Sequence, residues 1–178
     1  NSLKNTEGTN LISLKDSISL KHISYEYPDA SKTSLTDVNM TIPAGSIVGI
    51  IGTTGSGKTT VADVILGLLE VTNGQLQIDG KKIDSNNIRS WQRNIGYVPQ
   101  HIYLSDKSIS NNIAFGKNPN DVKQTDIEEA SKIANLHDFV INELPLKYDT
   151  IVGERGVRLS GGQRQRIGIA RALYRKPE

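Results

Sequence analysis

A glycine-rich loop between an apolar run and a helical pattern is the feature that most constrains this sequence. Residues 52–59 match the pattern G-x-x-x-x-G-K-[ST]. The apolar run before them, residues 46–51, is typical of a strand that is covered on both faces of a parallel sheet. After the loop, apolar residues recur on one face of a predicted helix: Val61, Val64, Ile65 and Leu68. Strand, loop and helix in this order are the setting of a phosphate-binding loop.

Such a loop binds phosphate through its backbone. Glycines let the chain wind tightly so that successive N–H groups point at phosphate oxygens, and the helix N-terminus adds its positive dipole end. Lys58 can then reach the β- and γ-phosphates, and the Thr59 hydroxyl can bind Mg²⁺. A flexible surface loop is the alternative, which the flanking strand and helix disfavour. The predicted nucleotide ligands are Gly52, Thr53, Thr54, Gly55, Ser56, Gly57, Lys58, Thr59 and Thr60.

The composition limits the number of domains and the kinds of ligand that can be expected. With 178 residues, 36% of them hydrophobic and 22% charged, the chain is expected to form one globular domain. Its formal charge of +2 does not indicate nucleic acid, and the absence of cysteine excludes disulfides and thiolate metal sites. The polar residues 1–13 are predicted to be a linker, with the domain at residues 14–178. Because the chain begins at Asn1 and not at Met, we expect it to be a piece of a longer protein.

The order of predicted elements indicates an α/β fold with a helical insert. Alternating apolar residues predict half-buried strands at residues 18–27 and 38–42, and further strands are expected before Asp79-Gly80 and at residues 95–98. A capping-box pattern at Thr125-x-x-Glu128 predicts a helix with Ile127, Ala130, Ile133 and Ala134 on one side. A second helix is expected from Ser160, with an apolar side formed by Ile167, Ala170, Leu173 and Tyr174.

The start of that second helix offers another anion site. Ser160 is a good N-cap, the two glycines after it leave backbone N–H groups uncovered, and the helix dipole favours an anion there. The motif is Leu159, Ser160, Gly161, Gly162 and Gln163, and with it the chain resembles the ATP-binding domains of ABC proteins. In that family two such domains face each other head to tail, and each signature motif closes over the ATP held by its partner. The resemblance therefore implies a second nucleotide-binding domain as partner, which is expected to be another copy of this chain in a homodimer.

Other segments resemble the same family in the same order. Tyr27 matches the aromatic residue that stacks on adenine, although a tyrosine at a strand end is commonly a packing residue. Gln100 matches the glutamine that contacts Mg²⁺ or the attacking water, whereas His101 and Ser105 depart from the family pattern. The resemblance implies a P-loop NTPase fold of ABC type, with a mixed core sheet, an antiparallel β subdomain and a helical subdomain at about residues 101–165.

The segment before the signature resembles exporters within this family. Residues 148–156 are similar to the stretch with which exporter domains touch the transmembrane domain, although Glu154 and Arg155 could also pair with each other at the surface. The implied function is ATP binding and hydrolysis that powers export, at the cytoplasmic face of a membrane, with a transmembrane domain fused upstream. Residues 65–69 are similar to exporters of lipids and lipid-linked oligosaccharides. The expected transmembrane-domain contacts are Val152, Gly153, Glu154, Arg155 and Gly156.

Two other readings remain open. A basic run near the C-terminus is compatible with a soluble ABC ATPase that acts on nucleic acid or ribosomes, but its charges are spread around a helix and lack aromatic partners, so no nucleic acid is expected. A nucleotide-binding module without turnover is the third reading. The family's Asp-Glu strand, with the general base, and its switch histidine match nothing in this chain, which is therefore expected to be truncated and inactive alone. The catalytic residues that it does supply are Lys58, Gln100 and Ser160.

Overall fold

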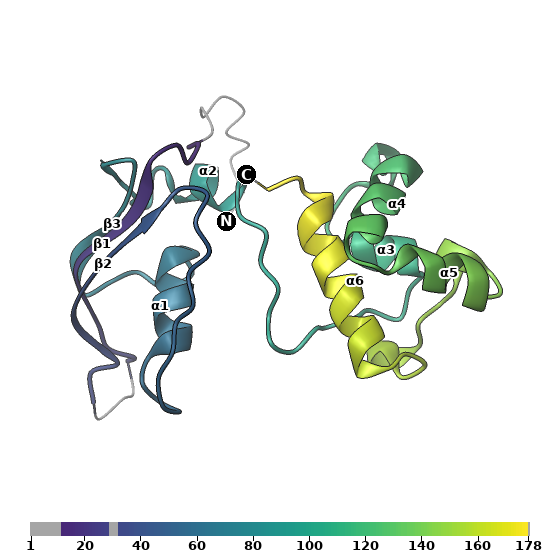
Figure 1. Cartoon of the computed structure of the whole chain (residues 1–178), viewed down its shortest axis with the longest axis horizontal. Helices are drawn as coiled ribbons and strands as arrows, with labels where there is room; N and C mark the ends of the chain where they lie inside the picture. Colours follow the sequence, from purple (N-terminus) through teal and green to yellow (C-terminus); the bar gives the residue numbers. More distant parts are fainter. Residues whose placement is uncertain (1–11, 29–31, 178) are drawn as a thin grey trace. The chain divides into compact units, whose positions relative to one another are not determined.

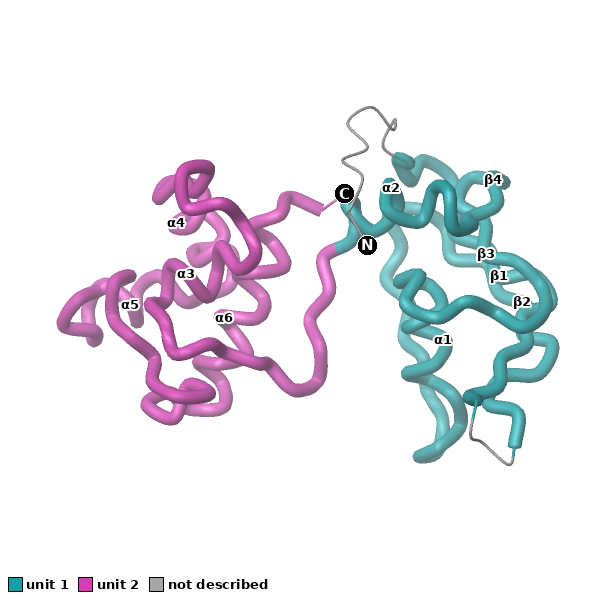
Figure 2. The backbone as a smooth tube through the Cα atoms, turned by 180° about the vertical axis from the view of Figure 1, so that it is seen from behind, with its two compact units in different colours: residues 1–95, 178 teal, residues 96–177 magenta. Residues whose placement is uncertain are grey.

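The computed structural model describes residues 12–28 and 32–177 and contains two compact units. Unit 1 comprises residues 1–95 with Glu178, and unit 2 comprises residues 96–177 (Figure 2). Most of the predicted linker lies outside the described residues, and Ile12 is already buried in the core of unit 1. The phosphate-loop motif belongs to unit 1, whereas Gln100 and the signature motif belong to unit 2.

Unit 1 is built on an antiparallel sheet in the order β2-β1-β3-β4 (Figure 2). Its strands are β1 (Ser17–Tyr25), β2 (Leu35–Pro43), β3 (Asn73–Ile78) and β4 (Lys81–Lys82). In β1 the buried residues Leu20 and Ile23 are three positions apart, and the pairing register shifts between them. A β-bulge therefore resets the alternation, which is why the apolar pattern of the sequence changes phase at this point.

The hairpin between β3 and β4 turns at Asp79 and Gly80, as their sequence predicts. Both residues have positive φ (50° and 76°), as the tightest hairpin turns require. The Asp79 carboxylate accepts hydrogen bonds from the backbone N–H groups of Lys15, Asp16 and Ser17, each at 2.8 Å. These bonds hold the pKa of Asp79 below its usual value, with Ser17 making the largest contribution. The turn thereby fastens the start of β1 to the hairpin.

Two helices cover the sheet of unit 1. Helix α1 (Lys58–Ile65) buries Val61 and Val64 in the same core as the strands. It ends before Leu68, the last residue of the predicted apolar face, which is exposed. Helix α2 (Ile88–Gln92) adds Trp91, which is buried and donates its indole N–H to the carbonyl oxygen of Ile65 at 2.8 Å. This bond satisfies a backbone acceptor at the C-terminal end of α1, where intrahelical partners run out.

Two predicted strands do not form. Residues 46–51 lie outside every strand, and Ile47 and Ile51 are 103% and 94% exposed. Residues 95–98 are likewise unpaired, with Tyr97 and Val98 exposed. A strand requires neighbours to satisfy its backbone, and the sheet of the described residues contains no parallel neighbour for either segment. The described residues therefore form an antiparallel sheet, as expected for the β subdomain, and no mixed core sheet.

Unit 2 is helical. Its longer helices are α3 (Ile109–Ile113), α4 (Gln124–Ile133), α5 (His137–Glu143) and α6 (Gly161–Tyr174). Short 3-10 turns join them: η1 (Pro119–Asp121), η2 (Lys147–Asp149) and η3 (Glu154–Gly156). Helix α6 packs against α3 and α4 around a core whose innermost residues include Ile109, Leu136, Val140 and Ile167 (Figure 1).

The expected apolar sides of these helices are mostly correct. In α6, Ile167, Ala170 and Tyr174 are buried, and Leu173 packs partly buried against the same core. In α4 the predicted capping box is wrong: Lys123 is the N-cap without a side-chain bond, Gln124 is the first helical residue, and Ile133 is 63% exposed. The helix begins one residue before Thr125, so this threonine lies inside its first turn and cannot serve as N-cap.

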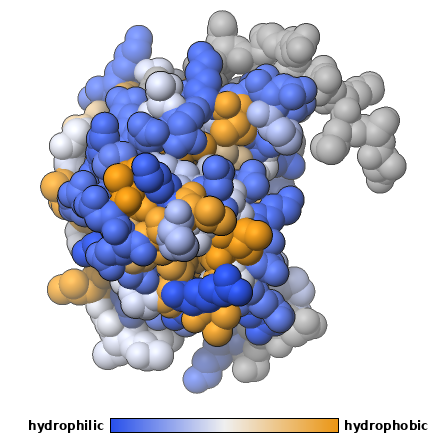
Figure 3. Space-filling view, turned by 90° about the vertical axis from the view of Figure 1, so that its right-hand side faces the viewer, coloured by the Kyte–Doolittle hydropathy of each residue, from blue (hydrophilic) through white to orange (hydrophobic). Residues whose placement is uncertain are grey.

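Exposed apolar side chains of unit 2 are scattered. Figure 3 shows apolar patches interrupted by polar side chains on the face that it displays. The exposed large apolar residues of this unit include Tyr103, Phe115, Ile133, Leu146, Ile151 and Val157. Isolated apolar residues of this kind are normal on a protein surface and do not by themselves define a site.

Candidate functional site

The phosphate-loop motif has the backbone geometry that anion binding requires. Helix α1 begins at Lys58, directly after Gly57, which is its N-cap and has a φ of 86°. No side chain caps this end, and the first turn holds no acidic residue. The N–H groups of the first helical turn have no intrahelical acceptor and carry the positive end of the helix dipole, so they are available to an anion.

Gly57 also meets a packing requirement. A Cβ at this position would lie 2.8 Å from the carbonyl oxygen of Ser34 and 2.9 Å from Leu35 Cδ2. The start of β2 therefore lies directly against the loop, and only glycine combines this close approach with a left-handed backbone.

Side chains of the predicted nucleotide ligands share one hollow with Tyr27. It has a volume of about 270 Å³ and is lined by Tyr27, Ser34, Gly55, Gly57, Lys58, Thr59 and Thr60. The Lys58 ammonium donates to the carbonyl oxygens of Gly52 and Thr53, at 2.9 and 2.7 Å, so it lies across the loop. The hollow thus combines a cation, uncapped helical N–H groups and hydroxyls, which together can hold a phosphorylated ligand.

Tyr27 combines a packed edge with an exposed surface. Its ring is 40% exposed and meets the ring of Tyr25 edge to face, with 4.9 Å between centroids. Its hydroxyl lies 3.4 Å from the Thr60 hydroxyl. Packing against Tyr25 fixes one edge of the ring, and the remaining exposed surface is available to a flat ligand such as a purine.

The signature motif opens α6. The Ser160 hydroxyl accepts from the backbone N–H of Gln163 at 3.2 Å, and Gln163 Oε1 accepts from the backbone N–H of Ser160 at 2.7 Å. These reciprocal bonds form a capping box that holds the helix start in place. At Gly161 and Gly162, by contrast, an added Cβ would meet no atom within 4 Å. Nothing in unit 2 requires these glycines, which leave the helix start bare to whatever approaches it, whereas Leu159 is buried in the core.

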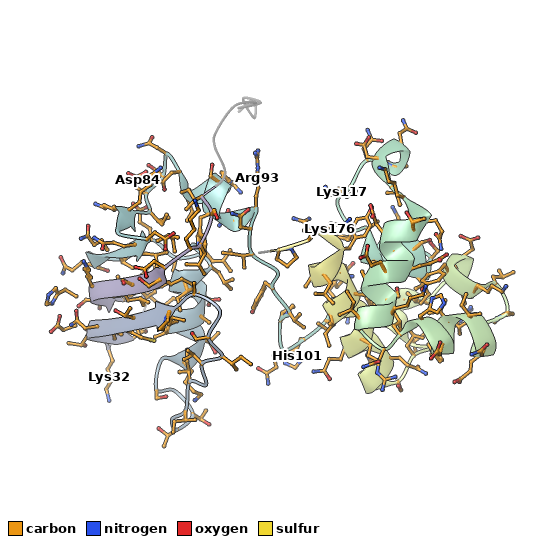
Figure 4. The ribbon with its side chains drawn as sticks, turned by 45° about the horizontal axis from the view of Figure 1, so that its top comes forward. Lys32, Asp84, Arg93, His101, Lys117 and Lys176 are labelled. Atoms are coloured by element: carbon orange, nitrogen blue, oxygen red, sulfur yellow. The ribbon has the colours of Figure 1, made fainter. Side chains whose placement is uncertain are left out.

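Gln100 shares a second hollow with this helix start. The hollow lies within unit 2, has a volume of about 380 Å³ and is lined by Gln100, His101, Ile102, Arg155, Gly161, Arg164 and Gln165. Figure 4 shows His101 on the extended segment that precedes the helices of this unit. The arrangement brings Gln100, the signature helix and Arg155 to one place, and its lining carries cationic side chains but no carboxylate.

The segment predicted to contact a transmembrane domain is only partly exposed. Val152, Gly153 and Gly156 are buried, whereas Glu154 and Arg155 are exposed. Val152 is held by a backbone hydrogen bond to Lys107, and Arg155 has a strained φ of 52° that directs the chain through η3. Among the ion pairs of the described residues, none joins Glu154 to Arg155. These two side chains are therefore the ones that can reach a partner.

Comparison with known proteins identifies the family of this chain. The model of a family described as "ABC transporter" matches residues 35–178. The chain belongs to the ABC transporter family. An uncharacterized ABC transporter ATP-binding protein of Bacillus subtilis is 40% identical over 96% of the chain, and an ATP-dependent lipid A-core flippase of Syntrophus aciditrophicus is 42% identical over 95%. A putative multidrug export ATP-binding/permease protein of Staphylococcus aureus is 40% identical over 98%.

A solved structure of a bacterial Atm1-family ABC exporter with ATP bound is similar as well. It matches 98% of the chain with a TM-score of 0.85 at 32% sequence identity. The predicted membership of the ABC transporter family and the predicted fold class are confirmed. The chain spans 27–30% of the length of these relatives and of the solved exporter. No helix of the described residues has the length and apolarity needed to cross a membrane.

Two residues with many contacts were not singled out as site residues by the sequence. Asn112 is wholly buried in α3, and Arg171 reaches it from α6. Burial lowers the pKa of the Arg171 guanidinium, with a further contribution from Arg175. Arginine nevertheless stays charged near neutral pH. A polar residue between Ile109 and Ile113, on the apolar side of a helix, was the available signal for Asn112.

Proposed function

We propose that this chain is the nucleotide-binding part of an ABC exporter, in which it binds Mg-ATP and contributes to its hydrolysis. The observation that carries the proposal is the hollow at the start of α1, where Lys58, uncapped helical N–H groups and the exposed face of Tyr27 converge. In this proposal Tyr27 stacks on the adenine, Gly52 to Thr60 surround the phosphates, and Lys58 neutralises the charge that develops on the γ-phosphate.

Magnesium fits the donors that this site offers. The described residues contain no group of three or more His, Cys, Asp or Glu side chains that could hold a metal by themselves. Mg²⁺ commonly binds through few protein oxygens together with substrate phosphates and water. The exposed Thr59 hydroxyl beside Lys58 is such an oxygen donor. The assignment of Gln100 as a second Mg²⁺ ligand comes from the resemblance to ABC ATP-binding domains. The ion would supply charge neutralisation to the phosphates.

We extend the proposal to a head-to-tail pair of nucleotide-binding domains. The bare start of α6 at Gly161 and Gly162 has the open backbone and dipole that suit the γ-phosphate of a partner's ATP. Leu159 would support this motif from the core, while Ser160 and Gln163 hold its shape. A pair of identical chains is the simplest arrangement that lets one loop and one signature complete each site.

Export is supported by the names of the relatives, which include a lipid A-core flippase and multidrug export proteins. We propose that Glu154 and Arg155 contact a transmembrane domain fused upstream, and that the domain lies on the cytoplasmic face of a membrane. Action on nucleic acid is disfavoured, because the basic side chains of α6 are engaged internally: Arg164, Arg166 and Arg171 donate to backbone carbonyl oxygens of unit 2.

Phosphate release tests the proposal. The full-length protein should release phosphate from ATP in the presence of Mg²⁺, and chelation of the metal should stop the release. The polypeptide of residues 1–178 should turn over ATP negligibly, because loss of a general base costs about 10²- to 10⁴-fold in rate. Absence of turnover by the full-length protein would overturn the ATPase assignment. Rapid turnover by the short polypeptide would overturn the view that its catalytic base lies elsewhere.

A further inference from the structure

The segment that follows Gln100 is fastened to α6 by an arginine–asparagine pair. The Arg171 guanidinium donates from Nε to the carbonyl oxygen of Asn112 at 2.8 Å and from Nη1 to that of Tyr103 at 3.0 Å. Its Nη2 lies 3.5 Å from Asn112 Oδ1. The guanidinium carbon is 5.1 Å from the centroid of the Phe115 ring, within the range of a cation–π contact. All three nitrogens of one side chain are thus directed at α3 and the segment before it.

Asn112 extends this connection along the segment. Its amide nitrogen donates to the carbonyl oxygens of Ser105 and Ser108, both at 3.0 Å, and its Oδ1 accepts from the backbone N–H of Ser105 at 2.9 Å. The side chain is wholly buried, so each of these bonds is made where water cannot replace it. One buried amide thereby fixes the backbone at residues 105–108.

A separate contact joins the same segment to the same helix. At Gly168, one turn before Arg171, an added Cβ would overlap Ile102. Positions three apart lie on one face of a helix, so Gly168 and Arg171 contact neighbouring residues of the segment after Gln100, Ile102 and Tyr103. Ile102 itself lines the hollow that Gln100 shares with the start of α6, and Tyr103 is the next residue along the chain.

We propose that Arg171 is a positioning residue that makes the segment after Gln100 and the signature helix move as one body. Displacement of residues 102–108 then carries Ser160 with it, because α6 is continuous from Gly161 to Tyr174. The role concerns hydrolysis and not ATP capture, since the hollow that holds Tyr27 and Lys58 is built entirely from unit 1. The inference rests on the proposed ATPase function.

The test compares Arg171→Lys with Arg166→Lys in the full-length protein. Lysine keeps the charge but cannot donate in the fixed fork that serves Tyr103 and Asn112 together. Arg166 lies on the same helix and donates a hydrogen bond of 3.2 Å to the carbonyl oxygen of Asn135, away from residues 102–108. Both variants are measured for the ATP dissociation constant and for phosphate release per molecule of bound ATP.

Arg171→Lys should lower turnover per bound ATP by about 10- to 100-fold, the scale on which a small misplacement of catalytic groups acts. Its ATP dissociation constant should stay at the wild-type value, and Arg166→Lys should match the wild type in both measurements. A purely structural role would instead reduce bound ATP and turnover together. Wild-type turnover by Arg171→Lys, or an equal loss of binding and turnover, would overturn the proposal.

Phe115→Ala provides the same test if Arg171→Lys does not fold. The Phe115 ring is 47% exposed, so its removal should be tolerated, yet it takes away the surface that orients the guanidinium. Reduced turnover with unchanged ATP binding supports the role of Arg171, and unchanged turnover contradicts it. If the wild type itself shows no turnover, the ATPase function fails; if the wild type is active and these variants equal it, only the role of Arg171 fails.

Discussion

Replacing Gly57 by alanine should damage both the phosphate loop and the packing beneath it. The left-handed backbone at φ 86° costs a residue with a Cβ about 1–2 kcal/mol. The added atom would also lie 2.8 Å from the Ser34 carbonyl oxygen and 2.9 Å from Leu35 Cδ2, closer than carbon atoms pack. Overpacking of this kind costs about 1–3 kcal/mol. The two effects together predict a local destabilisation of about 2–5 kcal/mol.

Gly45→Ala is the matched control, because Gly45 also has a positive φ (70°) but an added Cβ would meet nothing within 4 Å. It should show only the backbone cost of about 1–2 kcal/mol. Hydrogen exchange of the amides of α1 measures the local free energy, and an ATP titration measures binding. Gly57→Ala should lose protection in α1 and ATP affinity, whereas Gly45→Ala should keep ATP affinity. Equal exchange and equal affinity in the two variants would refute the packing argument.

Two further perturbations test unit 1. Asp79→Asn removes a carboxylate whose pKa is lowered by folding. Such a carboxylate stabilises the fold at pH values above its ordinary pKa of 3.8, and this stabilisation is lost as the pH falls through the pKa of the folded state. The variant should therefore have a lower urea midpoint than the wild type at pH 7, and the difference should disappear on acidification; a pH-independent difference would contradict this. Trp91→Phe leaves the Ile65 carbonyl oxygen without its donor and should destabilise α1 by about 1–3 kcal/mol. Hydrogen exchange of the α1 amides measures this change, and unchanged protection of these amides would contradict the prediction.

Local signals in the sequence located most of the elements that the structure contains. The change of phase between Leu20 and Ile23 corresponds to the bulge of β1, and Asp79-Gly80 forms the predicted hairpin turn. The motif and its helix placed Lys58 at the start of α1, and Ser160 caps α6 as its residue type predicts. For the hairpin turn, the start of α1 and the cap of α6, the determining interactions lie within a few residues, so the local pattern is sufficient.

The errors arose where distant partners decide the outcome. Residues 46–51 have the composition of a buried strand, but strand formation depends on neighbours that the sheet of the described residues does not supply. The Thr125 pattern failed because α4 starts one residue earlier, a shift within the usual uncertainty of helix ends. Asn112 and Arg171 are 59 positions apart, and no periodicity in the sequence links them.

The central claim is that the phosphate loop binds ATP and that the signature motif is needed for its hydrolysis. Two variants of the full-length protein test this claim most directly. Lys58→Ala should lose ATP binding, because it removes the cation that lies across the loop. Ser160→Arg should bind ATP as the wild type does but release no phosphate, since it places a bulky side chain at the bare start of α6. Equilibrium ATP binding and phosphate release, measured side by side, give this pattern if the two motifs act on one shared reaction. Full-rate hydrolysis by Ser160→Arg, or wild-type ATP affinity in Lys58→Ala, would contradict it.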